Sequence, residues 1–265
     1  MTDWIQGDVH HRDAKLHYYR SPPNDLPSLV LCHGFSDNGL CWERVSQALA
    51  ADFNIIMIDA RNHGLSSTSP VTSEDMIDDL AAVIRDHDLG PVTALGHSMG
   101  AGTVAGLAAE YPNLVTKIIL EDPPWHSAQE PNTPAAGARR AQGFEKFLQM
   151  IEKLSDAQLL AFGKAQQPSW DDEDFPAWVQ SKRQVSPLAL AGLKYSDWQA
   201  RVKKIQCPAL LIHADDSRDG ILTPPVVNAV LASNGCFSAE AVKNAGHNIR
   251  RDQFEAYIIV LRNFL

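Results

Sequence analysis

The sequence predicts an α/β fold in which a mostly parallel β-sheet is flanked by helices. Short apolar runs that are typical of buried strands lie at 28–32, 54–58, 92–95, 116–120 and 209–213, and a further strand is expected near 237–241. Helical patterns alternate with them at 42–51, 73–88, 99–111 and 224–233. Strands that alternate with helices pair in parallel, because the crossover helix returns the chain to the same end of the sheet. We therefore expect one sheet that spans both halves of the chain.

One stretch, 123–205, breaks this alternation. It contains several prolines, an Ala-rich helical pattern at 134–154 and an acidic run at 171–174. None of its segments has the short, β-branched pattern of a strand. We expect a helical cap at 123–205, inserted into a core domain that is formed by 1–122 and 206–265.

Composition and charge narrow the classes of function. Apolar residues make up 45% of the 265 residues and charged residues 21%, which suits a globular protein with a sizeable core. The formal net charge of −9 would repel phosphate backbones and anionic lipids, so neither a nucleic acid nor a membrane is an expected partner. The four cysteines are dispersed without a CxxC pair, and the first residues lack a signal-peptide pattern. We expect no metal centre and a cytoplasmic location, and the sequence indicates no oligomeric state.

A candidate nucleophile lies in the run Gly96-His97-Ser98-Met99-Gly100, which follows one predicted strand and opens a predicted helix. This context makes a GxSxG match a candidate nucleophile elbow. The glycines allow a sharp, strained turn that exposes Ser98 at the carboxyl edge of the sheet. The helix N-terminus also directs free backbone N–H groups toward a developing oxyanion. The alternative is a serine that only caps the helix.

His247 is the candidate general base. It lies between the last predicted strand and a final helix that is predicted to run toward Leu265, so its loop is expected at the same sheet edge as Ser98. An imidazole can take the proton of a serine hydroxyl and later return it to a leaving group. Of the other histidines, His97 adjoins the nucleophile and is expected to point away from it.

Two strand ends offer a carboxylate that could orient His247. The loop after 209–213 carries Asp216 and Asp219, but the use of either requires a special loop shape. Asp122 follows the strand at 116–120, and two prolines after it direct the chain away from the sheet and fix the carboxylate at the strand end. We favour Asp122 as the acid and keep Asp219 or Asp216 as the alternative.

Four motifs along nearly the whole chain resemble the α/β-hydrolase superfamily: HGF at 33–35, DARNHGLS at 59–66, GHSMG at 96–100 and AGH at 245–247. The resemblance implies the α/β-hydrolase fold, an eight-stranded and mostly parallel sheet with an inserted helical cap. The backbone N–H groups of Phe35 and Met99 would then form the oxyanion hole. The chain departs from the family in one place: aligning Ala214 with the glycine of the usual Gly-x-x-Asp pattern puts Ser217 at the acid position.

The resemblance implies a serine hydrolase that cleaves a carboxylic ester, thioester or lactone through an acyl-enzyme on Ser98 and requires no cofactor. Its partner would be a small acyl substrate. Trp125 and His126, which are close in sequence to Asp122, are candidates for the substrate pocket. Two other interpretations stay open. The same triad supports C–C bond hydrolysis or perhydrolysis, and some proteins of this fold are non-catalytic ligand receptors.

Overall fold

A computed structural model describes residues 4–126, 134–190 and 197–265. The strands in these ranges are β1 (Ile5–His11), β2 (Ala14–Arg20), β3 (Ser28–Cys32), β4 (Asn54–Ile58), β5 (Val92–His97), β6 (Val115–Glu121), β7 (Ala209–His213) and β8 (Phe237–Ala241). They form one eight-stranded sheet in the order β1-β2-β4-β3-β5-β6-β7-β8. β2 pairs antiparallel with β1 and β4, and every other pairing is parallel. The predicted eight-stranded, mostly parallel sheet is therefore confirmed.

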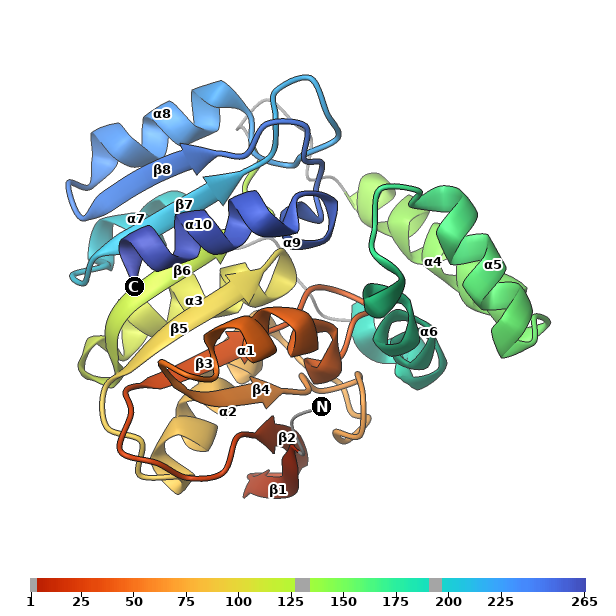
Figure 1. Cartoon of the computed structure of the whole chain (residues 1–265), viewed down its shortest axis with the longest axis horizontal. Helices are drawn as coiled ribbons and strands as arrows, with labels where there is room; N and C mark the ends of the chain where they lie inside the picture. The colour runs from red at the N-terminus through yellow and green to blue at the C-terminus, as the bar shows by residue number, and fades with distance from the viewer. Residues whose placement is uncertain (1–3, 127–133, 191–196) are drawn as a thin grey trace.

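Helices connect the strands and cover both faces of the sheet (Figure 1). They are α1 (Glu43–Leu49), α2 (Ser73–Asp86), α3 (Met99–Glu110), α4 (Pro134–Glu152), α5 (Asp156–Gln166), α6 (Phe175–Gln184), α7 (Trp198–Lys204), α8 (Pro224–Ser233), α9 (Ile249–Asp252) and α10 (Phe254–Phe264). The first predicted helix, at 42–51, is shorter than expected, because a 3-10 turn at Gly39–Trp42 precedes α1.

Alternation along the central strands divides the apolar side chains between two cores. In β4, Ile56 and Ile58 contribute to one core and Ile55 and Met57 to the other. Helices α2, α3, α7 and α8 cover the first face, and α1 and α10 cover the second. Each fully buried aliphatic side chain contributes about 1.5–3 kcal/mol to folding. Because both faces are buried, the central strands are continuous apolar runs, which is why the sequence predicted them.

A third apolar cluster lies among the helices between β6 and β7. Residues of α4, α5, α6 and the segment before α6 form it, with Ile151, Leu159, Trp170, Phe175 and Trp178 buried. Figure 1 shows α4, α5 and α6 together at one side of the sheet domain. Helix α7 lies inside the range predicted as cap but packs on the sheet domain, because its apolar side chains are buried in the same core as α3. The assignment of 123–205 to a separate cap remains a prediction.

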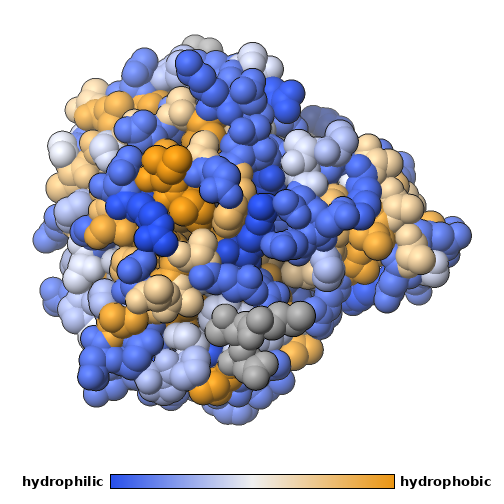
Figure 2. All heavy atoms as spheres, viewed as in Figure 1, coloured by the Kyte–Doolittle hydropathy of each residue, from blue (hydrophilic) through white to orange (hydrophobic). Residues whose placement is uncertain are grey.

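On the face shown in Figure 2, hydrophilic residues predominate and apolar residues form separate groups among them. Among the described residues, no helix has the length and apolar character that a bilayer crossing requires.

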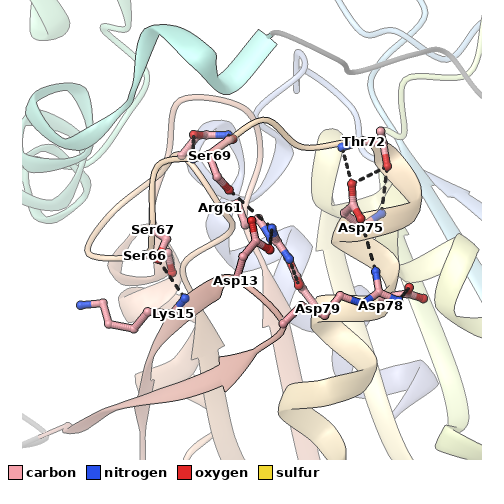
Figure 3. A network of polar contacts seen from close by, with 12 residues as sticks. Asp13, Lys15, Arg61, Ser66, Ser67, Ser69, Thr72, Asp75, Asp78 and Asp79 are labelled. Carbon is pink, nitrogen blue, oxygen red and sulfur yellow. Dashed lines mark hydrogen bonds and ion pairs between the residues drawn. The ribbon is translucent and has the colours of Figure 1, made fainter.

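A buried guanidinium fixes the loop that follows β4 (Figure 3). Arg61 is 3% exposed and donates to both carboxylate oxygens of Asp79 in α2, at 2.6 and 2.9 Å, and to Asp13 at 3.0 Å. Thr72 and Asp75 form a capping box that begins α2. The ion pair therefore joins the carboxyl end of β4 to the helix that packs beneath it.

We expect Arg61→Met to destabilise the fold by about 3–5 kcal/mol, because the substitution leaves the buried carboxylate of Asp79 without its bidentate partner. Urea unfolding followed by circular dichroism measures the change. Arg12→Met is the matched control, since it removes exposed ion pairs to Asp75 and Asp78, and we expect it to cost less than about 1 kcal/mol. Equal losses in the two variants would contradict the role assigned to Arg61.

Candidate functional site

Ser98 occupies a strained turn between β5 and α3. Its φ of 50° and ψ of −113° lie in a region that side-chain-bearing residues rarely adopt. The turn is held by two backbone hydrogen bonds, from Ser98 N–H to the carbonyl of Glu121 at 2.8 Å and from Gly102 N–H to the carbonyl of Ser98 at 3.0 Å. Strain at a single residue persists only where the surrounding structure fixes it, and such residues concentrate at functional sites.

The two glycines of the motif are required by close backbone contacts. A Cβ on Gly96 would lie 2.3 Å from the carbonyl oxygen of Gly100, and a Cβ on Gly100 would lie 2.2 Å from that of Cys32. Both neighbours are backbone atoms, which cannot rotate away as a side chain can. The close packing of α3 on β3 and β5 therefore depends on these positions, as a nucleophile elbow requires.

Asp122 and His247 form the polar centre of the site. The carboxylate of Asp122 is completely buried at the end of β6, and its Oδ2 lies 2.6 Å from Nδ1 of His247. Backbone N–H groups of Ile221 and Leu222 donate to the same carboxylate at 2.8 and 2.9 Å. Because an ionised carboxylate only accepts hydrogen bonds, Nδ1 of His247 carries the proton and Nε2 keeps a lone pair when the ring is neutral.

His97 connects the nucleophile turn to the loop of His247. It precedes Ser98, its Nε2 donates to the carbonyl oxygen of His247 at 3.0 Å, and the two imidazole centroids are 4.6 Å apart. Burial lowers the pKa of His97 well below its usual value, with the Arg250 charge adding to the effect, so this ring is neutral. Within the described chain, neither Oγ of Ser98 nor Nε2 of His247 makes a hydrogen bond. Catalytic hydrogen bonds often form only once substrate is bound.

Neither of the alternative acids forms a hydrogen bond with His247 among the described residues. Asp216 and Asp219 are exposed in the loop after β7, and Asp219 lies against the backbone of Gly246, where a Cβ would meet its Oδ1 at 2.2 Å. Asp215 supports the loop instead. It accepts hydrogen bonds from the backbone N–H groups of Asn244 and Ser217, which lower its pKa to about 2.

The predicted oxyanion donors come from neighbouring segments, since Met99 directly follows Ser98 and Gly34, which precedes Phe35, lies against the ring of His97. Met99 N–H belongs to the first turn of α3, where backbone N–H groups have no intrahelical acceptor. The N–H of Phe35 donates to none of the described residues. The next N–H, of Ser36, donates to Nε2 of His63 at 3.2 Å. Burial, with a contribution from His33, lowers the pKa of His63 to about 3, so the ring stays a neutral acceptor.

The structure shows where the predicted pocket residues lie without assigning them a ligand. Trp125 is buried and stacks on Trp198 of α7, with ring centroids 5.5 Å apart. His126 is half-buried, and its carbonyl accepts a hydrogen bond from the Trp198 indole at 3.0 Å. A cavity of about 40 Å³ lies between α2, α3 and the sheet edge, lined in part by Met76 and Met99. Neither Trp125 nor His126 lines this cavity, and their role in binding remains a prediction.

Sequence analysis missed a buried charge cluster beneath the site. Glu121 accepts hydrogen bonds from the backbone N–H of Arg250 at 3.1 Å and from the hydroxyl of Tyr257 at 3.1 Å. The Arg250 guanidinium contacts Glu121 and also donates to Asp37 at 2.9 Å. A signal was present, because Glu121 is a charged residue at the end of an apolar strand, and buried charges are paired. In the described ranges, no three ligating side chains are grouped to hold a metal ion.

Comparisons with known proteins agree with this architecture. The family model described as alpha/beta hydrolase fold matches residues 27–249. Lipase LipV of Mycobacterium tuberculosis is 26% identical over 215 residues, which cover 81% of this chain and 76% of the lipase. N-formylmaleamate deformylase of Pseudomonas putida is 24% identical over 266 residues, covering 98% of this chain and 96% of that protein. The crystal structure of E-2-(acetamidomethylene)succinate hydrolase has a TM-score of 0.79 at 19% identity and covers 98% of both chains.

We expect Gly100→Ala to destabilise the protein by about 1–3 kcal/mol or more, because the added methyl group meets the backbone at the end of β3 and overpacks the turn. Gly143→Ala in α4 is the matched control. A Cβ there meets nothing within 4 Å, so the gain in helix propensity should stabilise the protein by about 0.5–1 kcal/mol. Urea unfolding of both variants measures the change in the free energy of unfolding, which should have opposite signs. An unchanged free energy of unfolding in Gly100→Ala would show that the elbow tolerates a side chain.

Proposed function

The chain belongs to the α/β-hydrolase family, and we propose that it cleaves a carboxylic ester, thioester or lactone through an acyl-enzyme on Ser98. The observation that carries the proposal is the 2.6 Å pair of Asp122 and His247 beside the strained Ser98 turn. The pair fixes the tautomer of His247 so that Nε2 has the free lone pair. This is the arrangement that a serine nucleophile requires of its general base.

The proposed reaction begins when Nε2 of His247 takes the hydroxyl proton of Ser98 while Oγ attacks the carbonyl carbon. The oxyanion receives hydrogen bonds from the N–H groups of Phe35 and Met99. The tetrahedral adduct then collapses, the bond to the leaving alcohol or thiol breaks, and His247 returns the proton to it. A water molecule releases the acid by the same steps in reverse, and Asp122 remains ionised throughout.

A second candidate substrate is a small N-acyl compound of the kind named for the deformylase relative. Its support is the full-length similarity, since the two chains align over 98% of this chain and 96% of the relative. The same residues serve this reaction, because His247 can protonate a nitrogen leaving group as it protonates an alkoxide.

The first test is a fluorophosphonate label located by mass spectrometry. We expect a single adduct on Ser98 and none in Ser98→Ala, because only a serine activated by His247 attacks such a reagent at neutral pH.

Turnover is measured with p-nitrophenyl acetate and butyrate, N-formylmaleamate and a vinylogous 1,5-diketone. Adduct formation at another residue would overturn the role of Ser98. Cleavage of the diketone with untouched esters would instead favour C–C bond hydrolysis, and a labelled protein without turnover would favour a ligand receptor.

The second test separates the candidate acids. We expect Asp122→Asn to lower kcat on a p-nitrophenyl ester about a hundredfold or more, because the amide no longer holds Nδ1 of His247 in its protonated form. Asp219→Asn is the matched control and should change kcat less than about twofold, because its side chain is exposed and makes no bond to His247. A larger loss in Asp219→Asn would move the acid to the loop after β7.

A further inference from the structure

A buried lysine from α6 contacts the loop that carries Phe35. The side chain of Lys182 is 5% exposed. Its ammonium group donates to the carbonyl of Ser36 at 2.7 Å, to the Ser36 hydroxyl at 3.0 Å and to the carboxylate of Asp37 at 3.1 Å. An ammonium group has three protons to donate. These contacts therefore use it fully and leave Lys182 no capacity to bind a substrate anion.

The loop needs such support because its backbone is strained. Asp37 N–H donates to the carbonyl of Gly34 at 3.1 Å, which closes a turn with Phe35 and Ser36 at its centre. Ser36 has a φ of 63°, a value that turns normally reserve for glycine or asparagine at this position. Lys182 binds the carbonyl of this strained residue, and His63 binds its N–H. The two peptide units that follow the one carrying the Phe35 N–H are thus held by contacts from outside the turn.

The same lysine joins this loop to the charges beneath the site. Burial opposes ionisation of Asp37, but Arg251, Lys182 and Arg250 together hold the pKa of this carboxyl well below its usual value. The three cations lie at 3.0, 3.1 and 2.9 Å from the carboxylate. Two of them follow His247 in α9, whereas Lys182 comes from the helical segment between β6 and β7.

Further contacts show that the helical segment is docked on this loop. Asn38 donates to the side chain of Gln184 at 2.8 Å, two residues beyond Lys182. The Phe35 ring packs edge-on against Phe144 of α4, with centroids 4.7 Å apart. The turn that presents the oxyanion donor is therefore covered by α4 and braced by α6.

We propose that Lys182 is a positioning residue, through which the docking of α6 holds the Phe35 N–H in place for the oxyanion. The inference rests on the function proposed above. Without the ammonium group the Ser36 carbonyl loses its partner, and the strained turn relaxes away from the geometry that stabilises the transition state. The oxyanion site is thereby complete only when α6 is seated on the loop.

The test compares Lys182→Met with Lys164→Met, a lysine of α5 whose exposed ion pair with Asp172 touches no residue of the site. Complete labelling with the fluorophosphonate gives the concentration of reactive Ser98. Rates on p-nitrophenyl butyrate are divided by this concentration. We expect Lys182→Met to lower kcat by a factor on the order of 10 to 100 with KM changed less than about twofold, because a displaced oxyanion donor acts on the transition state alone. Lys164→Met should match the wild type.

Inhibition separates positioning from a purely structural role. Phenylboronic acid forms a tetrahedral adduct on the serine, so its inhibition constant should rise in Lys182→Met by about the factor that kcat falls. The inhibition constant of butyrate, a ground-state ligand, should not change.

If Lys182→Met does not fold, the same measurements on Lys182→Gln decide the question, with the same expectation. Unchanged kcat, or equal weakening of both inhibitors, would overturn the inference. If the wild type neither turns over these substrates nor takes the label, the proposed function falls and this inference with it.

Discussion

The buried carboxylate of Asp122 imposes the strongest constraint on this end of the molecule. A buried charge is tolerated only when hydrogen bonds replace its hydration. Two of its donors are the backbone N–H groups of Ile221 and Leu222, and the third is His247. The loop after β7 therefore supports an acid that comes from β6, and its own carboxylates stay outside the site. The arrangement also ties together the ends of three neighbouring strands, because the loops after β6, β7 and β8 meet at one side chain.

Much of this fold follows from local sequence. The bounds of β3, β4 and β7 were predicted to the residue, because buried parallel strands are continuous apolar runs that turn residues interrupt. Asp122 was favoured as the acid because two prolines after it end the strand. The sequence left Asp219 open as the alternative acid, because the donors that hydrogen-bond to Asp122 lie about a hundred residues away along the chain. The position of Trp125 could not be predicted for the same reason, because its stacking partner Trp198 is also far away along the chain.

Glu121 and Asp122 are adjacent acids with separate surroundings, and strand geometry explains the difference. Successive side chains of a strand point to opposite faces. Glu121 meets Arg250 and Tyr257 in the interior, whereas Asp122, just past the strand, meets His247 at the edge. Arg250 also reaches Asp37, so the interior cluster fixes the loops that carry Phe35 and His247 from below. Removal of either partner of a buried pair leaves an uncompensated charge, which is far more costly than the pair itself.

Backbone strain collects where these loops meet, and hydrogen bonding explains why it persists. Ser36, Ser98 and Asp122 all have positive φ values. The backbone N–H of each one donates to a fixed acceptor: His63 for Ser36, the Glu121 carbonyl for Ser98, and the Ile212 carbonyl for Asp122 at 2.8 Å. Two of these acceptors are carbonyl groups of sheet strands. If Ser98 or Asp122 relaxed to an ordinary φ, its N–H would lose that carbonyl acceptor. Ser36 lacks such an anchor in the sheet, and its carbonyl depends on the buried Lys182. Of the three strained positions, Ser36 is therefore the one whose geometry depends on a side chain of α6.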